Sequence, residues 1–215
     1  MFKFNLCNYN QEYYKIYKPL FKTNLNKIPS FLRVKEWLDV RPNELILDAG
    51  CGTGHQLNYY CGDATTGVGV DFSEVAIIIA RENFTRHQFL LQDLTKLEFE
   101  DEKFDKIVCF NTIEHIQDQD KAMKELRRVL KKGGIIVMGT NIKDSLQWRL
   151  YQMFIGERTH TKEFSVRGFI GFVSRYFTIL ETKVSSGVFR IPFPIIWIFH
   201  YILKGDILVK AINNK

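Results

Sequence analysis

The stretch that decides the fold runs Leu45-Ile46-Leu47-Asp48-Ala49-Gly50-Cys51-Gly52-Thr53-Gly54. Its first three residues are apolar and predict a buried strand, and a helix is expected to begin at His55. Between these elements, alternating glycines leave no Cβ between the backbone and a ligand, so the turn can wrap closely around a small molecule. A strand–turn–helix unit of this kind indicates a site for a nucleotide-like cofactor.

Asp48 narrows the choice of cofactor. A carboxylate here would repel a pyrophosphate and attract a ligand that carries an amino group and a positive sulfonium. The glycine spacing is G-x-G-x-G, which differs from the G-x-G-x-x-G of dinucleotide sites. The segment DAGCGTG resembles the first motif of class I S-adenosylmethionine-dependent methyltransferases. A glycine turn without a ligand is the alternative interpretation.

The resemblance implies S-adenosyl-L-methionine as the cofactor and S-adenosyl-L-homocysteine as the product. It assigns cofactor contacts in the first motif to Asp48, Gly50, Cys51, Gly52 and Gly54.

Two further predicted strands, 68–71 and 89–94, also carry acidic residues at or near their ends. Asp71 lies 17 positions after Gly54, close to the spacing at which a carboxylate accepts hydrogen bonds from two ribose hydroxyls. The run GVDFSEVAI resembles the family's second motif, with Ser73 as the N-cap of a helix. The resemblance adds further cofactor contacts: Phe72, Asp93 facing the adenine amino group with the Leu94 backbone nearby, and Asn111 and Glu114 after a fourth strand.

The order of the elements predicts an α/β fold. Residues 104–110, 134–140, 177–184 and 207–212 read as strands, and 121–131 and 166–175 as helices. Alternation of this kind predicts a Rossmann-like, doubly wound sheet of seven mostly parallel strands, with helices on both faces and its ligand at the carboxyl ends of the strands. In the family, the last strand is antiparallel and lies between strands five and six. The segment 159–165, with His160 and Phe164 among Ser and Thr residues before a helix, resembles the ubiquinone-biosynthesis-like branch, or type 11 methyltransferase domain.

The regions outside the motifs are expected to shape the substrate entrance. Residues 1–40 are interpreted as a helical lid segment, and residues 41–215 as the methyltransferase domain with a substrate-side insert at about 141–205. The resemblance gives Tyr14 and Tyr17 a place over the cofactor, and packing against the sheet is the alternative. Ser30, after Pro29, is the expected cap of the second N-terminal helix.

Charge and cysteine content indicate which partners and which cellular compartment suit the protein. Residues 41–140 hold 12 Lys and Arg against 16 Asp and Glu, while both flanks are basic. Basic flanks suit an anionic substrate or a membrane surface, although a solvated lysine-rich surface explains them equally well. The four cysteines form no C-x-x-C pair, which favours a reducing cytoplasm over a zinc site or a disulfide framework. Residues 191–203 are apolar but too short, and too broken by two prolines, to span a bilayer. They line the pocket, or residues 190–204 make peripheral membrane contact with the help of Arg190 and Lys204.

The chemistry expected is methyl transfer to a small-molecule, lipid-linked or glycan-linked acceptor, at oxygen. Methyl transfer to a hydroxyl is helped by a base that removes its proton. His115 is the first candidate for this base and His160 the second. His115 shaping the pocket is the alternative. The sequence Asn111-Thr112-Ile113 lacks the D/N-P-P-Y/F motif of nucleic-acid amino methylation, and no residues have metal-ligand spacing. A nicotinamide-dependent oxidoreductase and a non-catalytic cofactor-binding protein are the rival functions.

Overall fold

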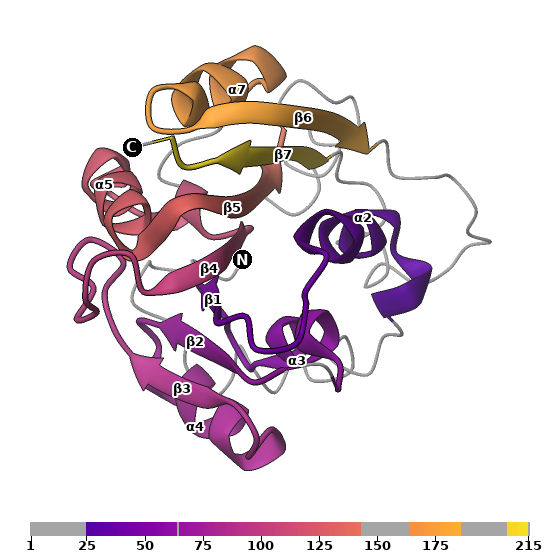
Figure 1. The fold of residues 1–215 in the computed structure, drawn as a ribbon, viewed down its shortest axis with the longest axis vertical. Coiled ribbons are helices and arrows are strands. Elements are labelled where there is room, and N and C mark those ends of the chain that lie inside the picture. The colour runs from indigo at the N-terminus through magenta and orange to yellow at the C-terminus, as the bar shows by residue number, and fades with distance from the viewer. Residues whose placement is uncertain (1–24, 64, 143–163, 186–205, 215) are drawn as a thin grey trace, which may run out of the picture.

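A seven-stranded sheet organises residues 25–63, 65–142, 164–185 and 206–214, the part of the chain that the computed structural model describes (Figure 1). The strand order is β3-β2-β1-β4-β5-β7-β6. The bounds are β1 Ile46–Ala49, β2 Gly67–Asp71, β3 Gln88–Leu91, β4 Phe104–Phe110, β5 Leu130–Asn141, β6 Thr178–Ser185 and β7 Asp206–Ile212. Strand β7 pairs antiparallel with both β5 and β6, and the remaining strands are parallel. The predicted doubly wound, Rossmann-like sheet with an inserted antiparallel strand is confirmed.

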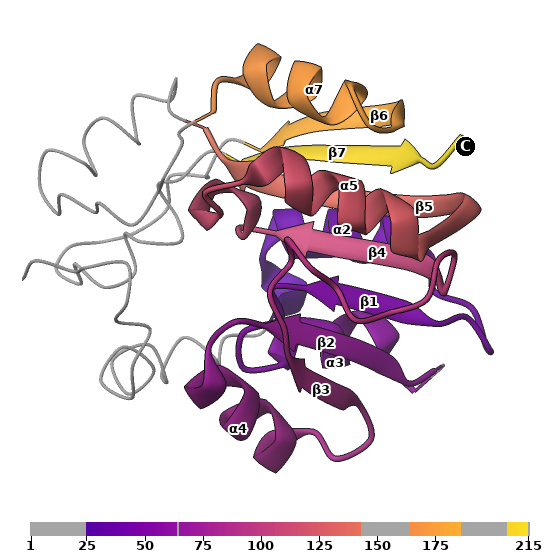
Figure 2. The same ribbon diagram turned by 90° about the vertical axis from the view of Figure 1, so that its left-hand side faces the viewer.

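The strand order reverses at β1, which pairs with β2 on one side and β4 on the other. In open α/β sheets, ligands bind outside the carboxyl ends of the strands at this reversal. Strands β1, β2 and β4 point to the same side of the molecule (Figure 2). The segments that follow these strands therefore meet at one edge of the sheet.

Helices cover both faces of the sheet. Their bounds are α2 Pro29–Leu38, α3 His55–Cys61, α4 Glu74–Asn83, α5 Gln119–Val129 and α7 Val166–Ser174, with short 3-10 turns η2 Leu25–Lys27 and η3 Ile113–His115. Buried residues of α5 and α7 form one hydrophobic cluster with one face of the sheet. Buried residues of α2, α3 and α4 pack on the opposite face. Among the described residues, no helix is long and apolar enough to cross a membrane.

Alternation along β4 explains the two-sided core. Ile107 and Cys109 belong to the cluster under α5 and α7, whereas Val108 and Phe110 belong to the cluster under α2. Phe110 meets the ring of Phe31 from α2 edge-on, with centroids 5.2 Å apart. Such an aromatic pair adds about 0.5–1.5 kcal/mol beyond the area that it buries.

Two local predictions about helix ends are wrong. Ser30 is not a cap: the N-cap of α2 is Ile28, because Pro29 at the first helical position has a fixed φ and lacks only an N–H that would have no partner there. Helix α5 ends at Val129 and not at residue 131. The Asn213 amide donates a 2.8 Å hydrogen bond to the Leu130 carbonyl, and Leu130 already pairs with β4.

Strand β3 is also shorter than predicted, ending at Leu91 before Asp93. The Gln92 N–H donates to the carbonyl of Asp71 at 3.0 Å, and Asp93 Oδ1 accepts from the Thr95 N–H at 2.8 Å. The chain therefore turns away from the sheet at Asp93. The predicted start of α3 at His55 and the Ser73 cap of α4 are confirmed, the latter by a 3.3 Å bond from the Ala76 N–H.

Candidate functional site

The glycine turn after β1 is held by its neighbours on both sides. The backbone N–H groups of Gly50 and Cys51 both donate to the carbonyl of Val70 in β2, at 2.8 and 3.0 Å. Gly50 has φ +86°, and a Cβ there would lie 2.2 Å from the Thr112 side chain, just after β4. The turn is therefore pinned between the ends of β2 and β4, and only glycine fits at position 50.

Gly52 differs from the glycines on either side of it. A Cβ on Gly54 would meet the ring of Phe89 at 2.6 Å, whereas a Cβ on Gly52 would meet none of the described residues within 4 Å. Gly52 has φ +50°, and its N–H donates to Asp71 Oδ2 at 2.9 Å. The turn therefore packs into the protein at its ends and opens outward at its middle, where a ligand could approach the backbone.

Asp71 connects the end of β2 to the glycine turn. Besides accepting from Gly52, it accepts a 2.9 Å hydrogen bond from the Ser73 N–H through Oδ1. Burial raises the pKa of Asp71, while these hydrogen bonds and the charge of His115 lower it. Each carboxylate oxygen retains a second acceptor position, so Asp71 can still accept a hydroxyl donor.

Asp48 is the most strongly perturbed carboxyl of the site. It lies in β1 with 2% of its surface exposed, and its Oδ2 has no hydrogen-bond partner within the described ranges. Burial and the neighbouring charge of Asp71 raise its pKa from 3.8 to about 8. A buried carboxylate oxygen without a partner fits a cationic ligand, which would supply the missing interaction.

Glu114 adds a third buried carboxyl at the same edge. It lies in η3 with 1% of its surface exposed. Burial, then the charges of Glu114 and Asp48, raise the pKa of Cys109 at the end of β4. Asp48 in β1 interacts with Asp71 at the end of β2, and Glu114 follows β4, so all three carboxyls lie at this edge of the sheet. A group of buried carboxyls favours a cation, which can pair with a carboxylate, and disfavours a pyrophosphate.

The other predicted contacts take different positions. Phe72, next to Asp71, is 60% exposed, and Asp93 is exposed in the turn beyond β3. The Leu94 side chain is buried in the core, which leaves only its backbone for a ligand. Asn111 is half-buried at φ +53°, and its Oδ1 accepts a 3.3 Å hydrogen bond from the Asn141 amide at the end of β5.

Of the two proposed bases, His115 lies in the described part of the site. It is half-buried in η3, close enough to Asp71 for its charge to lower the pKa of that carboxyl. His160, Tyr14 and Tyr17 lie outside the described residues, as does the segment 190–204.

Two contributors to the site have no clear signal in the sequence. Thr112 closes against Gly50, as described above, and Thr53 bonds the ring of His55 through its hydroxyl at 3.1 Å. Thr112 could have been suspected only because it follows a strand end. Thr53 carried no such signal, because its role depends on how the turn meets α3.

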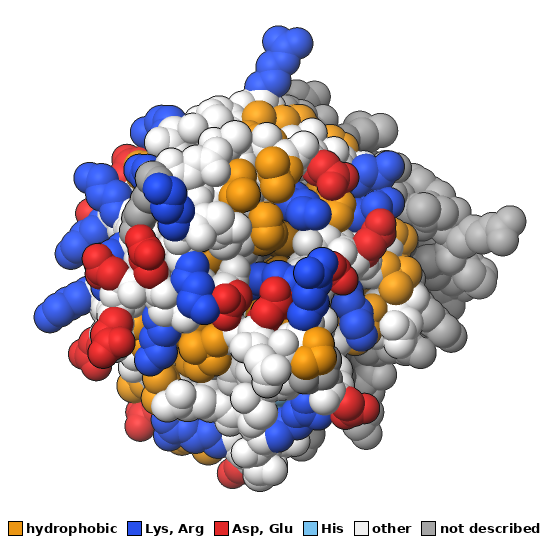
Figure 3. Space-filling model, viewed as in Figure 1, with side chains coloured by type: hydrophobic (Ala, Val, Ile, Leu, Met, Phe, Trp, Pro, Cys, Tyr) orange, Lys and Arg blue, Asp and Glu red, His pale blue; other side chains and the backbone are white. Residues whose placement is uncertain are grey.

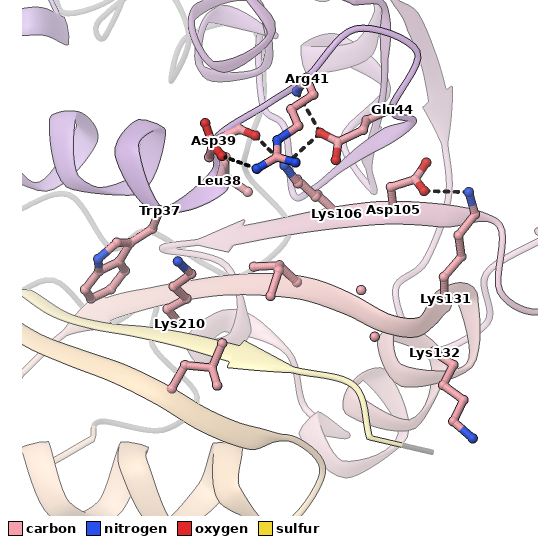
Figure 4. A pocket seen from close by; sticks show the side chains of 14 residues that line it. Trp37, Leu38, Asp39, Arg41, Glu44, Asp105, Lys106, Lys131, Lys132 and Lys210 are labelled. Carbon is pink, nitrogen blue, oxygen red and sulfur yellow. Dashed lines mark hydrogen bonds and ion pairs between the residues drawn. The ribbon is translucent and has the colours of Figure 1, made fainter.

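A separate hollow of about 410 Å³ lies at the opposite ends of the strands, where β4 and β5 begin (Figure 4). Its walls carry paired charges: Lys106 with Glu44 at 2.7 Å and Lys131 with Asp105 at 2.6 Å. Acidic and basic side chains are interspersed over this face of the molecule (Figure 3). The hollow shares no residue with the glycine turn and lies at the opposite ends of the strands. It is therefore not part of the site.

The sheet order agrees with the Rossmann-like fold of solved structures that are named as methyltransferases. Residues 47–138, which contain the three buried carboxyls, match the family model described as a methyltransferase domain.

The chain is similar to a probable S-adenosylmethionine-dependent methyltransferase of Mycobacterium tuberculosis, with 32% identity over 95 residues. That alignment covers 44% of this chain and 35% of the relative. A malonyl-[acyl-carrier protein] O-methyltransferase of Serratia marcescens is 32% identical over 121 residues, covering 54% of this chain and 47% of the relative. The chain thus matches about a third to a half of the length of these two proteins.

Two solved structures share the fold. A putative methyltransferase of Bacillus halodurans superimposes with a TM-score of 0.68 at 16% identity, covering 86% of this chain and 99% of the other. The [4+2]-cyclase SpnF superimposes with a TM-score of 0.68 at 17% identity, covering 94% of both chains. The same architecture therefore also occurs in a protein named for a different reaction.

Proposed function

We propose that the protein binds S-adenosyl-L-methionine and transfers its methyl group to an acceptor. The observation that carries this proposal is the buried Asp48, whose Oδ2 has no partner within the described ranges, beside Asp71 and Glu114 at the reversal of the sheet. When bound, the cofactor supplies a methyl group on a positive sulfonium for displacement by a nucleophile. Asp48, Asp71 and Gly52 would hold it: two carboxyls for its cationic and hydroxyl groups, and an open backbone for close approach.

For the acceptor we propose a small molecule, or a lipid-linked or glycan-linked group, methylated at oxygen. The name of the Serratia relative, an O-methyltransferase, supports oxygen as the accepting atom. In this proposal His115, in the segment after β4, takes the hydroxyl proton through a ring nitrogen. The chain's remaining task is to orient the acceptor and exclude water, because the reactive group belongs to the cofactor.

A nicotinamide cofactor is not favoured. Its pyrophosphate would meet Asp71 and Glu114, whose carboxylate forms repel it in a buried region, and a neutral Asp48 would offer it no positive charge. A different reaction on the same fold is the stronger rival, since SpnF shares the architecture under the name of a cyclase.

Calorimetric titration separates these functions. The protein is titrated with S-adenosyl-L-methionine and, separately, with NADH. Binding of the first and not the second is expected. Asp71→Asn should weaken binding, while Asp63→Asn, an exposed acid paired with Arg86, should leave the affinity unchanged. Preference for NADH would overturn the proposal.

The transfer step needs a second assay, in which a labelled methyl group is followed from the cofactor to a panel of metabolites, glycans and lipids. Once an acceptor is found, His115→Gln should reduce kcat by about 10²-fold or more if the ring acts as a base. Tight cofactor binding without labelling of any acceptor would support a non-catalytic role or another reaction.

A further inference from the structure

Ionising every carboxyl of the site at once would cost free energy, because the carboxyls are buried at the same edge of the sheet. Asp48 and Glu114 are 2% and 1% exposed, and Asp71 is 9% exposed. Asp71 has two backbone N–H donors on its carboxylate. By contrast, Asp48 Oδ2 has none within the described ranges, and the backbone of Leu57 alone donates a hydrogen bond that lowers the pKa of Asp48. Of these two acids, Asp48 is thus the one whose charge the protein compensates less.

Titratable groups from several elements of the described residues act on Asp48 or on its neighbours. Strand β2 contributes Asp71, the glycine turn Cys51, α3 Cys61, β4 Cys109 and η3 both Glu114 and His115. Burial, and then the nearby acids, raise the pKa of these thiols, so the cysteines are neutral near pH 7 and supply no charge. His115 acts on Asp71, whose pKa it lowers. The net effect of these neighbours on Asp48 is to favour its neutral form, in keeping with a pKa near 8.

We propose that Asp48 carries a proton in the cofactor-free protein and that binding of the cationic cofactor displaces this proton into solvent. The O–H bond of the carboxylic acid breaks, the proton passes to water or buffer, and the carboxylate that remains pairs with the incoming positive charge. The inference rests on the proposed function, and it makes Asp48 the residue that couples cofactor affinity to pH.

Proton release predicts how the association constant for the cofactor depends on pH. If one proton leaves for each cofactor bound, the association constant rises about tenfold per pH unit below the pKa of Asp48 and levels off above it. With that pKa at about 8, the rise covers the range from pH 6 to 8. Between pH 6 and 7 the amino group of the ligand is already mostly protonated, since α-amino groups titrate near 7.7–8.0. Protons released in that range therefore come from the protein.

The test is calorimetric titration of the whole protein with S-adenosyl-L-methionine at pH 6.0, 6.5 and 7.0, each in buffers of different ionisation enthalpy. The slope of the observed heat against buffer enthalpy gives the number of protons released, and a value approaching one is expected. Binding with no proton release would overturn the inference but leave the proposed function standing. No binding of S-adenosyl-L-methionine under any condition would overturn the proposed function itself.

Two variants test whether the proton released on cofactor binding comes from Asp48. Asp48→Asn cannot ionise, so its binding should release almost no protons and its affinity should lose the dependence on pH. Asp63→Asn, which removes a fully exposed acid paired with Arg86, should match the wild type. Undiminished proton release from Asp48→Asn would overturn the assignment. If that variant fails to fold, infrared difference spectra of the wild type still decide: loss of a protonated carboxyl band on binding supports the inference, and its persistence contradicts it.

Discussion

The N–H of Gly52 donates a 2.9 Å hydrogen bond to Oδ2 of Asp71, joining the open centre of the glycine turn to the end of β2. The other oxygen of Asp71 accepts from Ser73, the residue that caps α4. One carboxylate thus fixes the turn, the strand end and the start of a helix. A residue expected to bind a ligand is also a structural one.

Asp71→Ala should therefore lower stability as well as cofactor affinity. Two backbone donors would lose their acceptor, and a buried donor left unpaired costs about 1–3 kcal/mol. Urea unfolding measures the loss. The matched control is Asp93→Ala, because Asp93 is exposed and accepts one bond from Thr95, so a smaller loss is expected. Equal losses in the two variants would contradict the structural role of Asp71.

Gly50→Ala should be more destabilising than other Gly→Ala changes at positive φ. The new methyl would lie 2.2 Å from Thr112 in addition to adopting φ +86°. A left-handed backbone costs about 1–2 kcal/mol, and overpacking a further 1–3 kcal/mol or so. Gly133→Ala is the control, since Gly133 has φ +75° and no described residue lies within 4 Å of its Cβ position. Equal unfolding midpoints for Gly50→Ala and Gly133→Ala would show that the Thr112 side chain can move aside at no cost in stability.

Lowering the pH should reduce the free energy of unfolding, because His87 becomes protonated. Its Nδ1 accepts from the Gly67 N–H at 3.1 Å, so the ring must be neutral there. Burial, together with the charge of Arg86, lowers the pKa of His87 from 6.5 to about 4. Between these values the unfolded chain binds more protons, so the free energy of unfolding should fall as pH drops from about 6.5 to 4. In His87→Gln, urea midpoints measured against pH should show a shallower decline; an unchanged decline would point to other groups.

The ion pair of Lys106 and Glu44 should contribute measurably to stability. Lys106 is 7% exposed, and its Nζ lies 2.7 Å from the Glu44 carboxylate. Lys106→Met would leave that carboxylate without its cation, at a cost of about 1–3 kcal/mol. Lys132→Met, at an exposed position in the same hollow, should stay within about 0.5 kcal/mol of wild type. Adding Glu44→Gln to Lys106→Met should recover part of the loss, and a lack of coupling would contradict the pair.

The three described cysteines should resist alkylation in the folded protein. Cys51, Cys61 and Cys109 are buried, and burial raises the pKa of each thiol, that of Cys61 to about 12. Since the thiolate is the reactive form, iodoacetamide should modify them slowly until urea unfolds the chain. Peptide mass spectrometry follows each site separately. Rapid labelling of Cys51 in native protein would show that the glycine turn opens to solvent.

Much of the fold could be predicted from the sequence because its signals are local. The apolar run before Asp48, the alternating glycines and the Ser73 cap each act within a few residues. The bounds of β4 and the start of α3 follow directly from such patterns. Strand ends with acidic residues also predicted which edge of the sheet would carry the site, because parallel strands end on the same side.

Tertiary structure decided what depends on residues distant in the chain. Asn213 lies 83 positions from Leu130, yet its amide bonds the Leu130 carbonyl just beyond the end of α5. Thr112 leaves no room for a Cβ at position 50, but this contact exists only because β4 pairs with β1. The sequence placed a carboxyl at position 48, but its burial, and hence its raised pKa, results from packing against other elements. Local pattern specifies which groups a site contains, whereas desolvation and charge coupling exist only after distant segments have come together.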